Sequence, residues 1–317
     1  MIVIGAGEVR ALLSMRDAIE IVEAAMIAVT DGKANMPLRN VMEVGGGNRL
    51  GIMPGALSGE APTYGVKLIS LFPGNPAKGL SSHIGAMVMF DPETGAPAAV
   101  IDADALTAIR TAAASAGATR ALAREDARVL ALIGTGEQAE AHLAAIPLVR
   151  DIAEVRVAGR TPDRAAAFCD RMRADYPHLP LHPSASVAEA VRGADIVCTL
   201  TASPEVVLHG ADITPGTHVN AVGASIPTMQ EIDTELVLKS RLFVDYLPSA
   251  LAQAREIMDA LASGAMADGH ILGEIGALYA GRIEGRLAAG DITLYRSLGV
   301  AAQDLACAAA IIDRQRT

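Results

Sequence analysis

A glycine-rich turn near the middle of the chain constrains the fold more than any other segment. The apolar run Val129–Ile133 leads directly into GTGEQA at residues 134–139, and a helical pattern follows. In a G-x-G-x-x-A turn between a strand and a helix, Gly134 permits the tight turn and Gly136 lets the backbone approach a pyrophosphate. We therefore predict a dinucleotide site with contacts at Gly134, Thr135 and Gly136. A glycine-rich turn without a ligand is the alternative.

The residues after the next predicted strand indicate which dinucleotide is bound. NAD sites usually place an acidic residue there, where it holds the ribose 2′-hydroxyl. Here the strand Glu154–Ala158 is followed by Gly159, Arg160 and Thr161. An arginine pairs well with a 2′-phosphate and Thr161 can add a hydroxyl, so the sequence favours NADPH, with NADH as the second choice. A solvated surface arginine is the alternative interpretation of Arg160.

The order of predicted elements divides the chain into two parts of different architecture. After a helix at residues 14–31, short β-rich segments between residues 40 and 101 are separated by glycine and proline, which predicts an α+β part with a mainly antiparallel sheet. An Ala-rich helix at 104–124 follows. From residue 128 onward strands alternate with helices, which is typical of a doubly wound parallel sheet of the Rossmann type. The apolar C-terminal helix, at 297–314, could pack on either part.

The composition excludes several classes of partner. Asp and Glu number 36 against 26 Lys and Arg, and this net charge of −10, with only 3% aromatic residues, argues against nucleic-acid binding. The three cysteines lie far apart without a CxxC pair and the histidines show no ligand spacing, so we predict neither a disulfide framework nor a metal site. Without a signal-peptide layout or an apolar run of about 18 residues, we expect a cytoplasmic protein that does not enter membranes.

Three cations in the first part of the chain stand out against this acidic background: Arg39, Lys67 and Arg110. Lys67 lies in the middle of a predicted strand among apolar neighbours, and Arg110 lies on an otherwise apolar helix. A charge in such surroundings needs a partner, and an anionic ligand would supply one, because arginine grips a carboxylate through two parallel hydrogen bonds. Ordinary ion pairing within the protein is the alternative.

Several motifs together resemble the ornithine cyclodeaminase/mu-crystallin family over essentially the whole chain. They are KLISLFPGNPAKG at 67–79, LTAIRTAAAS at 106–115, GTGEQA at 134–139, NAVGA at 220–224 and DITLYRSLG at 291–299. The resemblance implies a homodimer in which residues 1–120, completed by a C-terminal helix at 298–317, form a substrate-binding and dimerisation domain. It implies a Rossmann domain at 121–297 and substrates that are α-amino or α-imino acids.

The resemblance also implies roles for individual residues. It places the substrate carboxylate and its surroundings at Arg39, Lys67 and Arg110. Beyond the glycine turn and Thr161, the cofactor contacts that it implies are Ser82, Arg110, Thr111, Glu137, Gln138, Arg160, Thr201, Val222, Gly223 and Ser297.

Two departures from the cyclodeaminase pattern separate the activities of the family. Cyclodeaminases carry an aspartate two residues after the glycine of the A-V-G segment, where this chain has Ser225. They also carry a glutamate shortly before a Met-Pro pair, and the run Leu50–Pro54 has none. Without these carboxylates the site has little to hold a second ammonium group. We therefore predict an NAD(P)H-dependent ketimine reductase that converts a small cyclic α-imino acid, such as 1-pyrroline-2-carboxylate or 1-piperideine-2-carboxylate, to the L-amino acid.

Three other functions stay open at this point. They are an NAD-dependent ornithine cyclodeaminase that forms proline and ammonia, an alanine-type amino-acid dehydrogenase, and a non-catalytic ligand-binding protein of the mu-crystallin type. The proton that reduction requires at the imine nitrogen could come from Lys67, from a water held by Ser225, or from solvent.

Overall fold

The computed structural model describes residues 1–316, and these divide into two compact units. The first unit joins Met1–Thr111 to the C-terminal residues from Val300 onward, and the second is Ala112–Gly299. The chain passes from the first unit into the second within helix α3 (Ala103–Leu122), whereas sequence analysis places the boundary near the end of that helix. Within the described part of the chain, no helix combines the length and the apolar character needed to cross a membrane.

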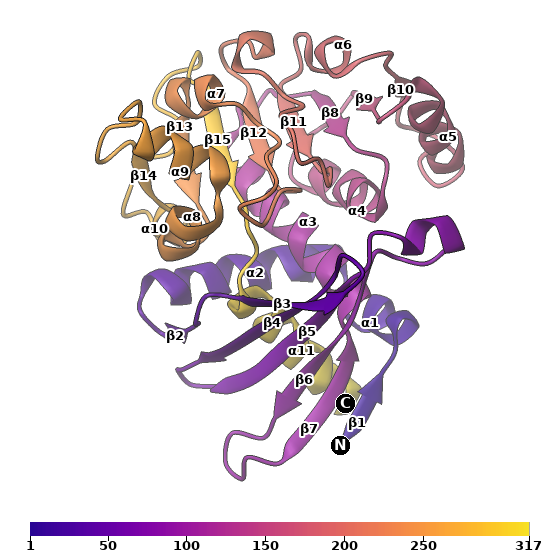
Figure 1. The fold of residues 1–317 in the computed structure, drawn as a ribbon, viewed down its shortest axis with the longest axis vertical. Helices are drawn as coiled ribbons and strands as arrows, with labels where there is room; N and C mark the ends of the chain where they lie inside the picture. Colours follow the sequence, from indigo (N-terminus) through magenta and orange to yellow (C-terminus); the bar gives the residue numbers. More distant parts are fainter. Residues whose placement is uncertain (317) are drawn as a thin grey trace. The chain divides into compact units, whose positions relative to one another are not determined.

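The first unit is built on a seven-stranded sheet in the order β1-β7-β6-β5-β4-β2, with β3 paired to β4 (Figure 1). The strand pairs are antiparallel apart from β1 with β7, so the predicted mainly antiparallel sheet is confirmed. The strands are β1 (Ile2–Ile4), β2 (Ala34–Asn35), β3 (Asn40–Gly45), β4 (Asn48–Leu57), β5 (Thr63–Leu71), β6 (His83–Phe90) and β7 (Pro97–Asp102).

Helix α11 packs on one face of this sheet, against β4, β5 and β6. Gly55 makes the close approach possible, because a Cβ there would lie 2.9 Å from that of Ala301. The other face of the sheet is half exposed, although Ile52, Val66 and Val88 on it are apolar. The helical segments of this unit besides α3 are α1 (Ala6–Leu12), α2 (Met15–Thr30), η1 (Asn75–Lys78) and α11 (Ala301–Arg316).

The second unit contains an eight-stranded sheet in the order β10-β9-β8-β11-β12-β15-β13-β14, and its neighbouring strands are parallel. The predicted doubly wound parallel sheet is therefore confirmed. Its strands are β8 (Val129–Ile133), β9 (Glu154–Ala158), β10 (Leu181–Pro183), β11 (Ile196–Thr199), β12 (His218–Ala221), β13 (Arg241–Val244), β14 (Ile271–Glu274) and β15 (Thr293–Arg296). Its further helices are α4 (Glu137–Ala145), η2 (Ile146–Leu148), α5 (Pro162–Met172), α6 (Val187–Val191), η3 (Gly210–Asp212), α7 (Thr234–Lys239), α8 (Leu247–Gln253), α9 (Arg255–Ala262) and α10 (Ile275–Tyr279).

Sequence analysis predicts no strand at β15, although this strand lies between β12 and β13 within the sheet. Its residues are Thr293, Leu294, Tyr295 and Arg296, and the polar ones interrupt the apolar run by which a buried strand is recognised. Tyr295 and Arg296 are nevertheless 0% and 2% exposed. The arginine is therefore buried with its charge, and its partners bear on the candidate site below.

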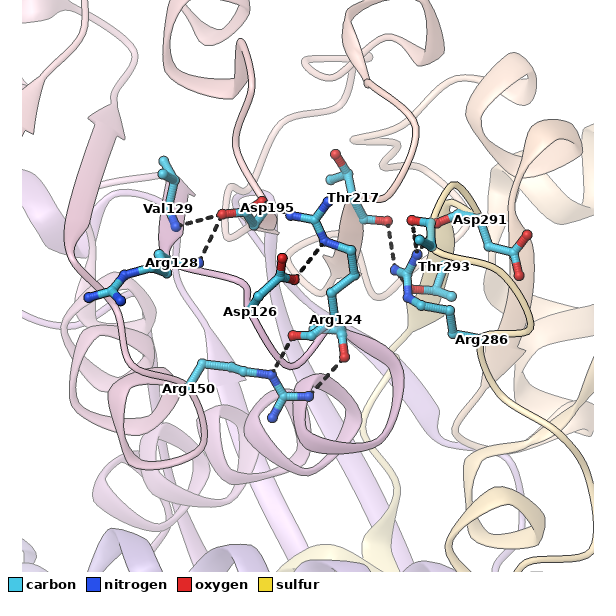
Figure 2. A network of polar contacts seen from close by, with 12 residues as sticks. Arg124, Asp126, Arg128, Val129, Arg150, Asp195, Thr217, Arg286, Asp291 and Thr293 are labelled. Carbon is cyan, nitrogen blue, oxygen red and sulfur yellow. Dashed lines mark hydrogen bonds and ion pairs between the residues drawn. The ribbon is translucent and has the colours of Figure 1, made fainter.

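Two arginines complete the hydrogen bonding at the C-terminal end of α3 (Figure 2). The last carbonyls of a helix have no partner within the helix. Arg150 donates to one of them, that of Arg120, at 2.9 Å, and also to the carbonyls of the two residues that follow the helix, Ala123 and Arg124, each at 2.8 Å. Arg286 donates to the Leu122 carbonyl at 2.9 Å and to the Thr293 hydroxyl, at the start of β15, at 3.0 Å. These contacts attach the end of α3 to the amino edge of the parallel sheet.

Replacing Arg150 with alanine should lower the free energy of unfolding by about 2–3 kcal/mol, because several charge-assisted hydrogen bonds disappear and helix-end carbonyls lose their partners. The matched control is Arg128→Ala, which removes an exposed ion pair to Asp151 and should cost less than about 1 kcal/mol. Urea denaturation of both variants measures the difference, and similar losses would contradict a specific capping role for Arg150.

Candidate functional site

The glycine turn follows β8 and lies beside the end of β9. Ile133 and Ala158 are register partners, and the Gly134 amide donates to the Ala158 carbonyl at 2.8 Å. Gly134 has a φ of +133°, and a Cβ there would lie 2.6 Å from the Leu200 carbonyl oxygen. Only glycine fits both the left-handed conformation and this approach. The turn therefore has the tight backbone geometry that the G-x-G-x-x-A sequence predicts.

The surroundings of this turn fit a bound dinucleotide. Gly136 caps the N-terminus of α4, and a Cβ added there would meet nothing within 4 Å, so the backbone is open to a ligand. Glu137 is the first residue of α4, and the side-chain oxygen of Gln138 is buried without a hydrogen-bond partner in the described chain. The hydroxyl of Ser297, after β15, is likewise buried and unpartnered there. Burying such an atom costs free energy unless a ligand or a water molecule forms a hydrogen bond with it.

The exposed residues after β9 include the predicted 2′-phosphate contacts. Arg160 is exposed, and Thr161 caps α5, where its hydroxyl accepts from the Arg164 amide at 3.4 Å. Arg164 is a second exposed arginine, in the first turn of α5, which sequence analysis did not single out. Thr135 lies close to this segment, because a Cβ at Gly159 would be 3.0 Å from its methyl group.

The remaining predicted contacts of this unit lie at the ends of β11, β12 and β15. Because these strands are parallel to β8, Thr201, Val222, Gly223 and Ser297 leave the sheet at the edge that carries the glycine turn. Ligands of doubly wound sheets bind outside this carboxyl edge. The structure thus brings the predicted cofactor residues of the second unit to one edge of one sheet. Their contact with a dinucleotide stays a prediction.

In the first unit, the buried cations Lys67 and Arg110 share one carboxylate, that of Asp304 on α11. Lys67 Nζ lies 2.9 Å from both carboxylate oxygens, and Arg110 Nε lies 3.0 Å from one of them. Gln303 accepts from Arg110 Nη1 at 3.0 Å, and the Thr107 hydroxyl lies 3.4 Å from Lys67 Nζ. These cations therefore do not depend on an external anion alone, because Asp304 supplies a counterion within the protein.

Asp304 and Gln303 are not among the residues predicted from sequence, although they lie in an A-A-Q-D segment at the start of an apolar helix. Both side chains are completely buried. A buried carboxylate needs cations, and Lys67 and Arg110 are the two buried candidates that the sequence indicates. Pairing them required knowing that α11, more than 180 residues later in the chain, returns to the first unit.

Burial and charge make Lys67 titrate near neutrality. Removal from water is the largest cause that lowers its pKa, followed by the Arg110 charge, and the pKa falls from 10.5 to about 7 despite the opposing effect of Asp304. Arg39 also lowers this pKa through its charge. For Asp304, burial acts to raise the pKa, but Arg110 and Lys67 outweigh it and the pKa lies below its usual value. The cluster thus holds an ionised carboxylate and an amine that can exchange a proton near pH 7.

Ser82 and Thr111, two other predicted residues of the first unit, have fewer polar contacts than Lys67 and Arg110. Ser82 is half-buried, and its hydroxyl lies 2.9 Å from Nδ1 of His83. The pKa of His83 lies below its usual value because of desolvation and then the Lys67 charge. The hydroxyl of Thr111, one residue after Arg110, is buried without a partner in the described chain.

Ser225 is half-buried in the loop after β12, directly after the buried residue Ala224. Nothing in its position assigns it a proton-transfer role, which stays a prediction. Among residues 1–316, no three His, Cys, Asp or Glu side chains are grouped so that they could hold a metal ion.

Comparison with known proteins agrees with this arrangement. The family model of the ornithine cyclodeaminase/mu-crystallin family matches residues 2–317. Ketimine reductase mu-crystallin from Mus musculus is 36% identical over 89% of this chain and 86% of its own length.

Two solved structures extend the comparison to the fold. A Thermococcus litoralis Delta(1)-pyrroline-2-carboxylate reductase, solved with NADH and L-proline, is 34% identical, with a TM-score of 0.95 over 100% of this chain and 98% of the other. An archaeal alanine dehydrogenase dimer with bound NAD is 34% identical, with a TM-score of 0.90 over 99% and 95% of the two chains. On these grounds the chain belongs to the ornithine cyclodeaminase/mu-crystallin family.

Proposed function

We propose that this protein is an NAD(P)H-dependent reductase that converts a small cyclic α-imino acid to the L-amino acid. The observation that carries the proposal is the charge balance at Asp304, where one carboxylate faces both Lys67 and Arg110. One positive charge of the two is left over in a buried place, and this favours a carboxylate ligand. Cyclic ketimine carboxylates, such as 1-pyrroline-2-carboxylate and 1-piperideine-2-carboxylate, carry that group beside the C=N bond. The relatives named as pyrroline-2-carboxylate and ketimine reductases support this substrate class.

Lys67 has the properties of the proton donor for this reaction. With a pKa of about 7, it is protonated in about half of the molecules at neutral pH and gives up its proton readily. A substrate carboxylate bound by Arg110 and Arg39 would bring the adjacent imine nitrogen to the same cluster. Asp304 keeps the Lys67 ammonium in place, because it contacts Nζ through both oxygens.

The residues at the carboxyl edge of the parallel sheet would hold the dinucleotide. The glycine turn would cradle the pyrophosphate, Arg160 and Thr161 the adenosine ribose, and Thr201, Val222, Gly223 and Ser297 the nicotinamide half. When bound, the reduced nicotinamide supplies the hydride for the imine carbon. The unpartnered oxygens of Gln138 and Ser297 support a polar ligand at this edge.

Replacing Arg160 with alanine should weaken NADPH binding by about 1–3 kcal/mol, or roughly 5- to 150-fold, because a charge-assisted contact to the 2′-phosphate disappears. NADH, which lacks that phosphate, should bind almost as before. Arg171→Ala is the matched control, since Arg171 is exposed on the same helix, α5, and pairs with Glu140. Calorimetric titration of both cofactors measures the effect, and equal weakening of NADPH and NADH would contradict the proposed role.

A second candidate is an amino-acid dehydrogenase of the alanine type, which the likeness to the archaeal alanine dehydrogenase favours. The open-chain imine of pyruvate and ammonia carries the same carboxylate and would use the same cations. Ornithine cyclodeaminase activity is less well supported, because Ser225 offers no carboxylate for a second ammonium group.

Cofactor oxidation with a panel of substrates tests the proposal. NADPH and NADH are followed in separate assays with 1-pyrroline-2-carboxylate, with 1-piperideine-2-carboxylate, and with pyruvate plus ammonia, and ornithine is assayed for ammonia release. We expect the highest kcat/KM with a cyclic imine. Faster turnover of pyruvate plus ammonia would favour the dehydrogenase. Ammonia and proline from ornithine without turnover of cyclic imines would overturn the proposal.

We further propose that the protein is a homodimer joined through its antiparallel sheet. The face of the sheet opposite α11 carries apolar residues such as Ile52, Val66 and Val88, which are only half-buried in one subunit. A continuous apolar sheet face is stable in water when another layer covers it. A second copy of the chain is the proposed layer, and the dimer of the related alanine dehydrogenase supports it.

Sedimentation at micromolar concentration should show a dimer and no stable monomer. Val88→Glu should shift the protein toward monomer, because it places a charge in the proposed interface. Leu287→Glu is the control, since Leu287 is 60% exposed in the second unit. A fully active monomeric wild type would contradict the proposed assembly.

A further inference from the structure

Ala224, in the loop after β12, has both of its backbone polar groups held by buried charged side chains. Its amide donates to Glu231 Oε2 at 3.0 Å. Its carbonyl accepts from Arg296 Nη2 at 2.5 Å. Glu231 and Arg296 are each 2% exposed, so neither can exchange this partner for bulk water. A loop residue bound in this way by opposite charges on two sides has little freedom to move.

Glu231 also joins this loop to the one after β11. Its Oε1 accepts from the Thr201 amide at 2.6 Å, and its Oε2 accepts from the Thr199 hydroxyl at 3.0 Å. The two loops touch through their backbones, because a Cβ at Gly223 would lie 2.1 Å from the Thr201 carbonyl oxygen. One carboxylate therefore fixes the loops that carry Thr201 and Gly223, two of the proposed cofactor contacts.

Arg296 is itself fixed by several partners. Its Nε pairs with Glu256, and its Nη1 donates to the carbonyls of Ala221 at 3.3 Å and Ser297 at 3.2 Å. A buried guanidinium is stable only when its N–H groups have hydrogen-bond partners. Here the N–H groups of Arg296 donate to carbonyls at the ends of β12 and β15 and to the carbonyl of Ala224. This explains why a charged residue ends a fully buried strand.

These contacts lie in the half of the sheet that receives the reactive end of a dinucleotide. The chain order β8, β9, β10 builds one side of the sheet, and β11 begins the other side against β8. In doubly wound folds the two sides bind the two mononucleotide halves. The loops after β11 and β12 belong to the half opposite the 2′-phosphate residues after β9.

We propose that Glu231 and Arg296 are positioning residues, which act through Ala224 to fix the loops that orient the nicotinamide half of the cofactor. The inference rests on the proposed dinucleotide site, and it is independent of which imino acid is reduced. Neither residue is a proposed contact of the substrate. Their effect is to preorganise the site, so that binding does not have to order these loops.

Glu231→Gln tests the proposal with a nearly isosteric change. An amide can accept through one oxygen only, so its NH2 group would face either the Thr201 amide or the Ala224 amide, donor against donor. We expect NADPH to bind at least about fivefold more weakly, because ordering of the loops must then accompany binding. The adenosine fragment 2′,5′-ADP should bind within about twofold of wild type, since its half of the site is unchanged. Hydrogen exchange in a peptide covering residues 222–231 should become faster.

Asp195→Asn is the matched control. Asp195 accepts from the amides of Arg128 and Val129, each at 2.9 Å, at the opposite edge of the same sheet. It should lower stability without changing the ratio of NADPH to 2′,5′-ADP affinity. Thr199→Val, which removes one donor to Glu231, is a milder variant in case Glu231→Gln does not fold, and it should change the same ratio in the same direction.

Turnover adds a further measurement. With a substrate that wild type reduces, Glu231→Gln should lower kcat by at least about tenfold, because small displacements of reacting groups are costly. The isotope effect from NADPH deuterated at C4 should rise as hydride transfer becomes limiting. The inference would be overturned if Glu231→Gln bound NADPH and 2′,5′-ADP more weakly by the same factor. It would also be overturned if the ratio of these two affinities stayed unchanged although hydrogen exchange at residues 222–231 became faster. If wild type reduces no imine, the proposed reaction fails, and the affinity ratio still decides the role of Glu231.

Discussion

Replacing Lys67 with methionine should lower kcat/KM for reduction of a cyclic ketimine by about 10²-fold or more, because positioned general acids contribute factors of this size. The side chain is 1% exposed and bonded to both oxygens of Asp304, so solvent cannot easily take its place as the proton donor. Steady-state kinetics at fixed, saturating NADPH measures the loss.

The pH profile of the wild-type enzyme should report the same group. The pKa of Lys67 lies at about 7, so the protonated form dominates below pH 7 and disappears above it. The kcat/KM for imine reduction should therefore fall as the pH rises through about 7, and oxidation of the amino acid, which needs the free amine, should rise over the same range. The imine protonates in solution as well, so the profile is compared with that of a variant in which position 67 does not titrate.

Lys67→Arg provides that comparison. Arginine keeps a positive charge beside Asp304 but does not release its proton near neutral pH. We expect KM to change less than kcat, and the inflection near pH 7 to disappear from the ratio of wild type to variant. A Lys67→Arg enzyme with unchanged kcat and an unchanged profile would show that the proton comes from elsewhere, and Ser225 with a bound water would be the next candidate.

Much of the fold follows from local patterns in the sequence. The apolar strand β8 and the glycine turn between β8 and α4 identify the parallel sheet, and β9 is recognisable by its alternation of polar residues with valine. Strand β15 is not found in this way, since Arg296 belongs to a buried strand only through partners distant in sequence, such as Glu256. The local pattern of β15 conflicts with its burial, and tertiary contacts decide the outcome.

The candidate site likewise contains some residues that the sequence pattern reveals and others that only the fold reveals. The cations Lys67 and Arg110 are recognisable, because each breaks an apolar pattern that the sequence otherwise keeps. Asp304 and Glu231 are not, because their significance comes from groups that the fold brings to them from other elements. Sequence spacing alone thus identifies which residues need a partner, whereas the three-dimensional structure identifies the partner.

Replacing Arg110 with alanine should lower kcat/KM for a cyclic ketimine by at least about tenfold, because a charge-assisted hydrogen bond to the substrate carboxylate contributes about 1.5–3 kcal/mol. The affinity for 2′,5′-ADP should change less, since that ligand tests the second unit. The substitution also leaves Lys67 and Asp304 as a neutral pair without the positive charge that now lowers the lysine pKa. The inflection in the pH profile should therefore move to higher pH.

Asp304→Asn should move the inflection in the opposite direction. Asp304 raises the pKa of Lys67, so its neutral replacement should bring that pKa below 7 and shift the fall in kcat/KM to lower pH. Removing the shared counterion of two buried cations should also cost about 3–5 kcal/mol of stability, so circular dichroism must show that the variant is folded at the assay temperature. Opposite shifts in Arg110→Ala and Asp304→Asn would identify Lys67 as the titrating group, because the two substitutions change its electrostatic surroundings with opposite sign. Shifts of the same sign, or none in either variant, would mean that the observed inflection belongs to the substrate or to another residue.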